Sequence, residues 1–369
     1  MIKKFWPLLL AAFLLTACSK GGSGVDAQKR SLSVLVTAEP PTLSSVGPVS
    51  SVGMFFQGHI FEGLCRYDKD NKLSPGVAES WELTEKSAIF KLRRDAKWSD
   101  GRRVTAHDFV FAWRLGAAPA NEYSFIMAPV KNAAKVSEGK LPATALGVTA
   151  VDDHTLKVEY ENPCAYFLAL TTFTTYMPIR QDIFEKWGAE KYAVDAEKML
   201  YNGPFVLSEW KHDVSLKMQK NEHYWDKDEV WLNEINIPAI TSQETTRFNM
   251  FISKDTALVE LGPNSIKPAL KRRLQTPMNS YVSGFVSYLE FNNRPGRLTA
   301  NKNLRKAISL VINRQDIVNK VLGLPGFMPS STMFPSWLPG AGKKLHEEHD
   351  MSFVPSDASL AMGLSLIHI

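Results

Sequence analysis

The chain has 369 residues, of which 44% are hydrophobic and 22% are charged, and its formal net charge is +5. This globular composition excludes collagen-like, low-complexity and fully disordered chains, and the length suffices for roughly two or three domains. The 43 lysines and arginines form no long basic run, which argues against a dedicated nucleic-acid-binding protein.

The N-terminal segment has the features of a bacterial export signal. Two lysines precede an apolar stretch, Phe5–Leu15, that is too short to span a ~30 Å hydrocarbon core. The following Leu-Thr-Ala-Cys resembles a lipobox, in which the cysteine (here Cys18) receives a lipid after cleavage. We therefore expect a lipoprotein signal peptide at 1–17 and a lipidated cysteine with a flexible tether at 18–30. The alternative is a general secretory signal with an incidental cysteine.

Only three cysteines occur, and no C-x-x-C motif brings two of them together, so a structural zinc site is not indicated. If Cys18 carries a lipid, Cys65 and Cys164 remain. An exported chain permits a disulfide between them, and the sequence leaves both a disulfide and two free thiols open.

The apolar pattern predicts a mixture of strands and helices along the chain. Thr105 is expected to cap a helix that has Asp108 three residues on and places Phe109 and Trp113 on one face. Turns are predicted at Asp100–Gly101 and at 152–153. Alternation and helical periodicity predict the other elements: strands at 32–36, 88–92, 156–160 and 235–237, hairpin arms at 205–210 and 214–218, and helices at 304–311 and 317–322.

Motifs that carry chemistry are missing from the sequence. It contains no nucleophile elbow, no H-E-x-x-H, no P-loop and no dinucleotide-binding fingerprint. The histidines of His346-Glu347-Glu348-His349 can share a helical face, but the segment is polar and lacks an evident third ligand, so a solvated surface is favoured over a metal site. We expect no catalytic residue, metal site or cofactor, and the mixed elements indicate an α/β protein with several lobes.

Several segments resemble the solute-binding proteins of bacterial peptide ABC transporters, and oligopeptide-binding proteins most closely. The main block comprises Pro75–Trp81, Phe90–Arg93 and Asp95–Phe109. Further segments follow in family order: Phe61–Leu64, Asp152–Leu156, Asn202–Phe205, Trp210, Asn221, Tyr224–Trp225, Glu290–Asn293 and Arg305–Ile308. The resemblance covers roughly residues 31–340.

The resemblance implies an α/β, two-lobed periplasmic-binding-protein clamp of the Venus-flytrap type with an additional inserted domain. Lobe I would comprise 31–57 and 200–282, the inserted domain II 58–199, and an incomplete lobe III 283–362. The last residues, 363–369, fit no family pattern. Because family members continue through a Trp-x-x-Asp-Tyr segment, we expect a truncated reading frame with a foreign tail; the alternative is a genuine short homologue.

The family also implies a function. The protein would be a monomeric, lipid-anchored protein on the periplasmic or cell-surface side of the membrane, which captures oligopeptides in an interlobe cleft. It would deliver them to the permease subunits of an ABC importer and their ATPases, with no cofactor and no nucleic acid. By position, the residues that would contact the ligand are Val49, Ser50, Ser51, Tyr123, Phe285 and Tyr288, for each of which ordinary packing is the alternative.

Other ligands and classes stay open at this point. The same fold could bind a dipeptide, a murein peptide, haem or a nickel chelate, and an exported lipoprotein could instead be a hydrolase or an adhesin. The sequence departs from the family at Leu43-Ser44-Ser45, where Leu-Asp-Pro is usual, and at Met250–Thr256 and Lys302–Arg305. These departures leave the subfamily and the ligand length open.

Overall fold

The computed structural model describes residues 24–349 except 263, 267–268, 270–285, 325, 331, 336, 339 and 341. Cys18 and Phe285 therefore lie outside the described residues. The chain divides into two compact units, Met1–Glu260 and Leu261–Ile369.

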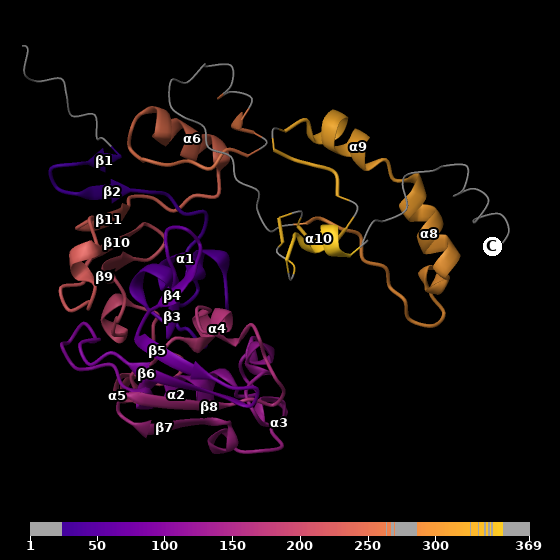
Figure 1. Cartoon of the computed structure of the whole chain (residues 1–369). Coiled ribbons are helices and arrows are strands. Elements are labelled where there is room, and N and C mark those ends of the chain that lie inside the picture. Colours follow the sequence, from indigo (N-terminus) through magenta and orange to yellow (C-terminus); the bar gives the residue numbers. More distant parts are fainter. Residues whose placement is uncertain are drawn as a thin grey trace, which may run out of the picture. The chain divides into compact units, whose positions relative to one another are not determined.

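The first unit contains a five-stranded sheet with the order β1-β2-β11-β10-β9 (Figure 1). Its strands are β1 (Val25–Asp26), β2 (Ser31–Ser33), β9 (Phe205–Lys211), β10 (Ser215–Lys220) and β11 (Glu234–Ile237). Strand β2 runs parallel to β11, with Leu32 opposite Ile235, and the other pairs are antiparallel. The predicted hairpin and the strand at 235–237 are confirmed, whereas the first predicted strand is shorter than expected and continues only as a bridge from Val36 to Ile240.

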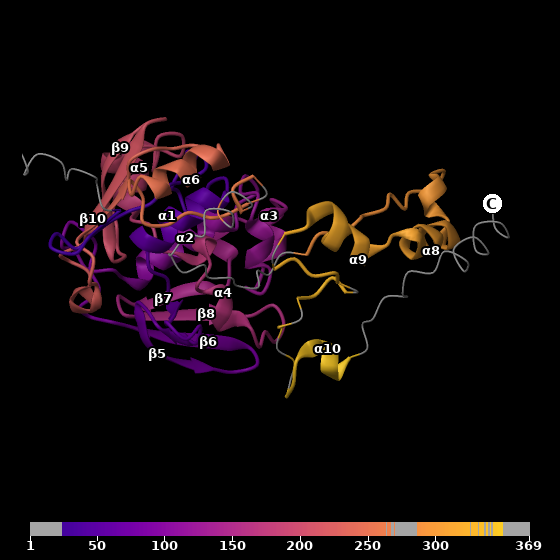
Figure 2. The same cartoon turned by 90° about the horizontal axis from the view of Figure 1, so that it is seen from above.

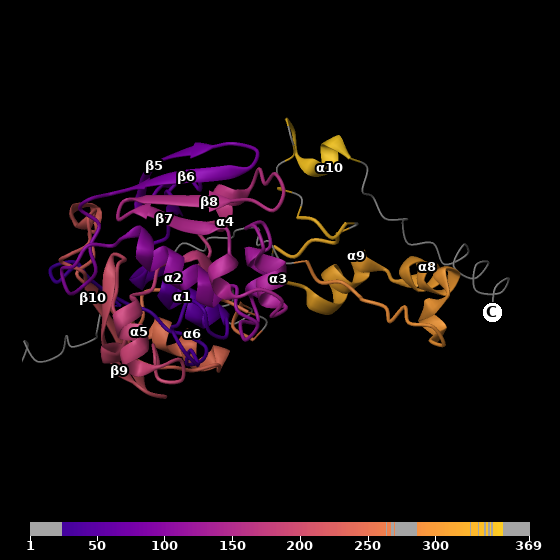
Figure 3. The ribbon, with the colours of Figure 1, turned by 90° about the horizontal axis from the view of Figure 1, so that it is seen from below.

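A four-stranded antiparallel sheet lies between β2 and β9 in the sequence, with the order β5-β6-β8-β7 (Figure 3). Its strands are β5 (Ala78–Leu83), β6 (Ser87–Leu92), β7 (Val148–Asp152) and β8 (Thr155–Glu159). Helix α2 (Ala106–Gly116) packs against β7 and β8 (Figure 2). The helix begins where predicted, because the Asp108 carboxylate accepts hydrogen bonds from the Thr105 N–H (2.8 Å) and hydroxyl (3.2 Å).

An aromatic core fixes α2 in this part of the chain. Trp113 is fully buried and meets Tyr176 edge-on at a centroid distance of 4.9 Å and Phe167 at 6.3 Å. Trp98 is also buried and donates from Nε1 to Asp108 (3.2 Å). Edge-to-face pairs of this kind add stability beyond their buried area, so the aromatics of this sequence block serve the fold.

The remaining elements of the first unit are short. They are α1 (Ser51–Ile60), β3 (Cys65–Tyr67), β4 (Leu73–Pro75), η1 (Ser124–Met127), α3 (Ala133–Ser137), η2 (Ala143–Ala145), α4 (Phe167–Leu170), η3 (Thr174–Tyr176), α5 (Gln181–Trp187), η4 (Ala196–Lys198), η5 (Lys227–Glu229) and α6 (Glu244–Ile252). Of these, α1 contacts both β9 and η3, so it links the five-stranded sheet to the region around α2.

A buried carboxylate joins segments that are far apart in the sequence. Glu62 follows α1 and accepts hydrogen bonds from the Tyr224 hydroxyl (2.5 Å) and Trp225 Nε1 (2.6 Å), while Arg66 lies 3.5 Å from it. The side-chain amide of Asn202 donates to the Glu62 carbonyl (2.8 Å), and its oxygen accepts the Glu62 N–H (3.2 Å). We call these five residues the Glu62 cluster; it unites three of the sequence segments that carried the family resemblance.

The second unit is described from Leu261 onwards with the gaps given above. Its elements are η6 (Leu298–Ala300), α8 (Lys302–Val311), α9 (Arg314–Asp316), η7 (Ile317–Leu322) and α10 (Leu345–Glu348). The predicted helix at 304–311 is confirmed as α8, whose Ala307 and Leu310 are buried. The next predicted helix forms as α9 followed by the π-helical turn η7, which ends at Gly323 with φ 56°.

Two general features concern the described residues only. No helix among them is long and apolar enough to cross a membrane. Both cysteines in this part are free thiols: Cys65 is buried and Cys164 half-buried, and burial raises the pKa of the Cys65 thiol.

Candidate functional site

The loop that precedes α1 is held by backbone and side-chain contacts from distant segments. The Leu43 N–H (2.9 Å) and the Thr42 hydroxyl (3.2 Å) both donate to the carbonyl of Ala193. Leu43 is fully buried, and the buried Gln57 of α1 donates its side-chain amide to the Ser44 carbonyl (2.9 Å). These contacts fix the chain on both sides of the loop that carries Val49, Ser50 and Ser51.

This loop carries the first three predicted ligand residues. Ser50 has an extended backbone (φ −132°, ψ 152°) and its hydroxyl accepts the Gly53 N–H (3.0 Å), so its side chain caps α1. Val49 is half-buried and Ser51 exposed. Neither the N–H nor the C=O of Val49 hydrogen-bonds another described residue. Free backbone polar groups beside an extended residue can pair with an extended peptide.

Tyr123 lies in a row of aromatic rings. Its ring stacks on Phe173 (centroids 6.1 Å apart, interplanar angle 22°) and tilts against Phe125 (5.5 Å). Its N–H donates to the side-chain oxygen of Asn121 (2.9 Å), and the side-chain NH₂ of Asn121 donates to the Gly116 carbonyl at the end of α2 (3.0 Å). Phe125 is 66% exposed. The row therefore presents apolar ring surface to solvent.

The loop and the aromatic row meet at the end of α2. A side-chain carbon at Gly116 would lie 3.1 Å from Thr175 Cγ2 and 3.8 Å from Val46 Cγ1. Gly116 thus sits between η3, which follows Phe173, and the loop that leads to Val49. Val46 lies three residues before Val49, and Thr175 lies two residues after Phe173, on which Tyr123 stacks. That Val49–Ser51 and Tyr123 bind a ligand stays a prediction.

The other two predicted residues belong to the second unit. Phe285 lies outside the described residues. Tyr288 lies in an irregular segment and is 61% exposed, so its assignment also stays a prediction.

A second polar cluster, centred on His212, was not predicted from the sequence. His212 lies in the β9–β10 turn and bridges two carboxylates, with Nδ1 2.6 Å from Glu39 and Nε2 2.9 Å from Asp195. Glu39 also accepts hydrogen bonds from Trp210 Nε1 (2.7 Å) and the Asp213 N–H (2.6 Å). We call these five residues the His212 cluster.

The charged groups of the His212 cluster shift one another's pKa values. Hydrogen bonds to Asp195 and Glu39 raise the pKa of His212 above its ordinary 6.5. Burial by itself raises the pKa of Glu39, but the hydrogen bonds from His212, Asp213 and Trp210 bring it below 4.5. The pKa of Asp195 is lowered by its hydrogen bonds from Lys198 and His212. The cluster therefore favours an imidazolium between two carboxylates.

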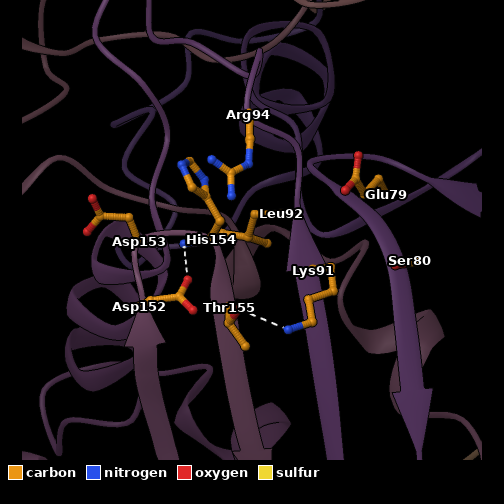
Figure 4. A pocket seen from close by; sticks show the side chains of 9 residues that line it. All are labelled: Glu79, Ser80, Lys91, Leu92, Arg94, Asp152, Asp153, His154 and Thr155. Atoms are coloured by element: carbon orange, nitrogen blue, oxygen red, sulfur yellow. Dashed lines mark hydrogen bonds between the residues drawn. The ribbon is translucent and has the colours of Figure 1, made fainter.

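A shallow polar depression lies elsewhere, where β7 and β8 turn (Figure 4). Asp152 accepts the His154 N–H (2.7 Å) and Lys91 donates to the Thr155 hydroxyl (3.2 Å). Asp152 thus shapes the predicted turn. The lining mixes both signs of charge and includes none of the predicted ligand residues. The described residues contain no group of three or more metal-ligating side chains, here or elsewhere.

Comparison with known proteins assigns the chain to a family. Residues 72–359 match the profile described as bacterial extracellular solute-binding proteins, family 5 Middle. The chain belongs to this family. The family consists of solute-binding proteins, and the α/β clamp predicted from the sequence is confirmed by the matching structures below.

Three similar proteins are informative about this solute-binding protein. The oligopeptide-binding protein OppA of Bacillus subtilis is 34% identical over 87% of the chain. The substrate-binding domain of an oligopeptide ABC transporter from Bacillus anthracis has a TM-score of 0.77 at 35% identity, over 92% of this chain and 66% of that one. OppA of Listeria monocytogenes, solved bound to peptide, has a TM-score of 0.76 at 31% identity, over 92% of this chain and 68% of that one. The chain spans 61% of the length of the Bacillus subtilis protein.

Two sets of residues at the site were missed from the sequence. Phe125 and Phe173 lie in no segment that carried the family resemblance, and only the structure shows their rings beside Tyr123, with Phe125 exposed. Glu39 lies beside Pro40 and Pro41 in the sequence, outside every predicted element. A carboxylate before a proline pair gives no signal of a histidine located more than 170 residues later in the sequence (the separation from His212 is 173).

Proposed function

We propose that the whole protein captures oligopeptides outside the cytoplasmic membrane and delivers them to an ABC importer. The observation that carries this proposal is the extended backbone at Ser50 beside Val49, whose N–H and C=O hydrogen-bond no other described residue. Membership in a solute-binding family and the similarity to proteins named for oligopeptide binding support it.

The physical basis is recognition through the peptide backbone. Main-chain hydrogen bonds to an extended segment are the same for any sequence, so they give affinity without selecting side chains. Aromatic rings such as the half-buried Tyr123 and the exposed Phe125 add contact area at low ordering cost. In this proposal residues 58–199 form an inserted domain, and the 49–51 and Tyr123 segments form one wall of the cleft.

Isothermal titration calorimetry tests the proposal directly. The full-length protein is titrated with mixed tri-, tetra- and pentapeptides, and with dipeptides and free amino acids as comparison ligands. We expect saturable heat with the oligopeptides. Absence of heat across the whole peptide panel contradicts the proposal, and heat with dipeptides alone shifts it to the dipeptide alternative.

We further propose that a lipid on Cys18 holds the mature protein at the outer side of a membrane. Its support is the lipobox-like Leu15–Cys18 sequence that follows the apolar stretch. Several acyl chains bind a membrane far more firmly than one, since each buried CH₂ adds ~0.8 kcal/mol. A Cys18→Ala variant should lose the lipid mass in intact-mass spectrometry and leave the membrane fraction; retention in that fraction would contradict the anchor.

A further inference from the structure

His212 bonds carboxylates with both of its ring nitrogens. A neutral imidazole has one N–H donor and one lone pair, and a lone pair facing a carboxylate oxygen is repelled. With both carboxyl groups ionised, the contacts to Glu39 (2.6 Å) and Asp195 (2.9 Å) can both be hydrogen bonds only when the ring carries two protons. The geometry of the bridge therefore favours the imidazolium between two ionised carboxylates.

The two carboxylates belong to the two segments that hold the candidate ligand loop. Glu39 lies before the loop, three residues ahead of Thr42 and four residues ahead of Leu43. Both of these donate hydrogen bonds to Ala193, which precedes Asp195 by two residues. The bridge from Glu39 through His212 to Asp195 thus links two segments that the hydrogen bonds to Ala193 also join.

We propose that His212 is a positioning residue for ligand binding: its protonated ring clamps Glu39 to Asp195 and thereby fixes the entry of the Val49–Ser51 loop. The clamp itself stands on the geometry of the His212 cluster. Its effect on ligand affinity rests on the proposed function, because it needs this loop to contact the peptide.

All of the charged groups that face His212 favour or tolerate the clamp. Besides Glu39 and Asp195, the neighbours are Asp213, which follows it in the turn, and Lys198, which pairs with Asp195. The Trp210 ring packs against the imidazole at a centroid distance of 4.9 Å. Glu209 and Lys211 on β9 pair with each other. Three carboxylates thus surround one histidine and one lysine.

The pH dependence follows from the direction of each shift. The pKa of His212 is raised above 6.5 in the folded protein, so its contribution is complete below pH 6.5 and is lost as pH rises through the folded pKa. The pKa values of Glu39 and Asp195 are lowered, so their contributions are lost only as pH falls through those lower values. The clamp is therefore closed below pH 6.5, down to the lowered pKa values of the carboxylates, and opens as the pH rises through the raised pKa of His212.

The first experiment measures the clamp without any ligand. The His212 ring is titrated by NMR in the wild-type protein, in Glu39→Gln and in Asp195→Asn. We expect a wild-type pKa above 6.5 that falls in both variants. A wild-type pKa at or below 6.5, or one that neither substitution moves, overturns the clamp.

The second experiment measures its effect on binding. Affinity for one tetrapeptide without titratable side chains, chosen from the panel that binds, is measured calorimetrically at several pH values between 5.5 and 9. The wild type should lose about twofold to fivefold in affinity as the pH rises, the size expected for a partly exposed ion-pair cluster. His212→Gln should bind with the weaker affinity at every pH.

His107→Gln is the matched control, because His107 is 66% exposed, pairs with one carboxylate (Asp153, 3.4 Å) and lies outside the His212 cluster. It should keep the wild-type slope. A pH slope that persists in His212→Gln, or a flat wild-type profile, overturns the positioning role. If no peptide binds at any pH, the proposed function fails, and the NMR titration alone decides whether the clamp exists.

Discussion

The Glu62 cluster and the His212 cluster both use a carboxylate to join distant segments, but at different depths. Glu62 is almost completely buried among Tyr224, Trp225 and Arg66. In the other cluster Glu39 keeps 17% of its side chain exposed and His212 keeps 51%. A buried carboxylate cannot be rehydrated when a partner is lost, whereas an exposed one can.

The difference in depth sets the direction in which each cluster responds to pH. Burial raises the pKa of Glu62, against the hydrogen bonds from Tyr224 and Trp225 and the charges of Arg66 and Arg93, which lower it. The pKa of Glu39 is lowered. The folded protein therefore favours the protonated form of Glu62 and the ionised form of Glu39, so the two clusters respond to pH in opposite directions.

The largest expected effect is at Glu62. Glu62→Gln places an amide NH₂ or a poorer acceptor against the two donors, Tyr224 and Trp225. It also removes the negative charge that faces Arg66. The free energy of unfolding should therefore fall by about 3 kcal/mol. Urea denaturation measures it. The control is Glu82→Gln on β5, an exposed position where we expect a change below about 0.5 kcal/mol. Equal losses of unfolding free energy in the two variants would contradict the claim that the buried carboxylate contributes more to stability than an exposed one.

Trp225→Phe should cost about 2 kcal/mol of unfolding free energy. It removes the hydrogen bond to Glu62 (2.6 Å) and weakens the stacking of Arg93, whose guanidinium carbon lies 3.7 Å from the ring centroid. Trp231→Phe, at a tryptophan that is 55% exposed, serves as control in the same denaturation series. A smaller loss at Trp225 than at Trp231 would contradict this account of the Glu62 cluster.

The contributions of Glu39 and Glu62 to stability should change with pH in opposite directions, and the change at Glu39 should be about 1 kcal/mol or less. The stability that Glu39 adds over Glu39→Gln should shrink as pH falls below 4.5, because its folded pKa is lowered. The difference between wild type and Glu62→Gln should grow as pH falls towards 4.5, because the folded pKa of Glu62 is raised. Denaturation curves between pH 4 and 7 measure both differences in stability. If the two differences change with pH in the same direction, the assignment of the two pKa shifts is wrong.

The smallest effect on stability is expected at the aromatic row. Phe125→Ala should change the unfolding free energy by less than about 0.5 kcal/mol, since the ring is 66% exposed. It should nevertheless weaken binding of peptides with aromatic side chains by roughly threefold to tenfold, the value of an aromatic pair. Tyr166→Ala, 63% exposed in the same unit, is the control and should leave affinity unchanged. If Phe125→Ala and Tyr166→Ala bind these peptides with equal affinity, the aromatic row is not part of the binding site.

Local patterns were enough to predict much of the fold. The capping pair Thr105–Asp108 and the alternation in 88–92 and 205–218 depend on neighbours in sequence, so they could be recognised without the structure. The π-helical form of 317–322 could not, because α- and π-helical turns share nearly the same apolar pattern.

The site was harder to predict because its parts meet only in three dimensions. The contact between Val46 and Gly116, the stacking of Tyr123 on Phe173, and the bridge from Glu39 through His212 to Asp195 all join residues from separate elements. Sequence position alone named Val49–Ser51 and Tyr123 through the family resemblance. It gave no reason to single out His212 or Phe125.

The identity of the bound solute is the central claim, and mass spectrometry of the ligand that copurifies with the full-length protein tests it most directly. The protein is purified without added ligand, denatured, and the released small molecules are sequenced. We predict a mixture of short peptides of differing sequence, because recognition through the backbone is indifferent to side chains. Release of a single non-peptide molecule, such as haem or a metal chelate, would contradict the account.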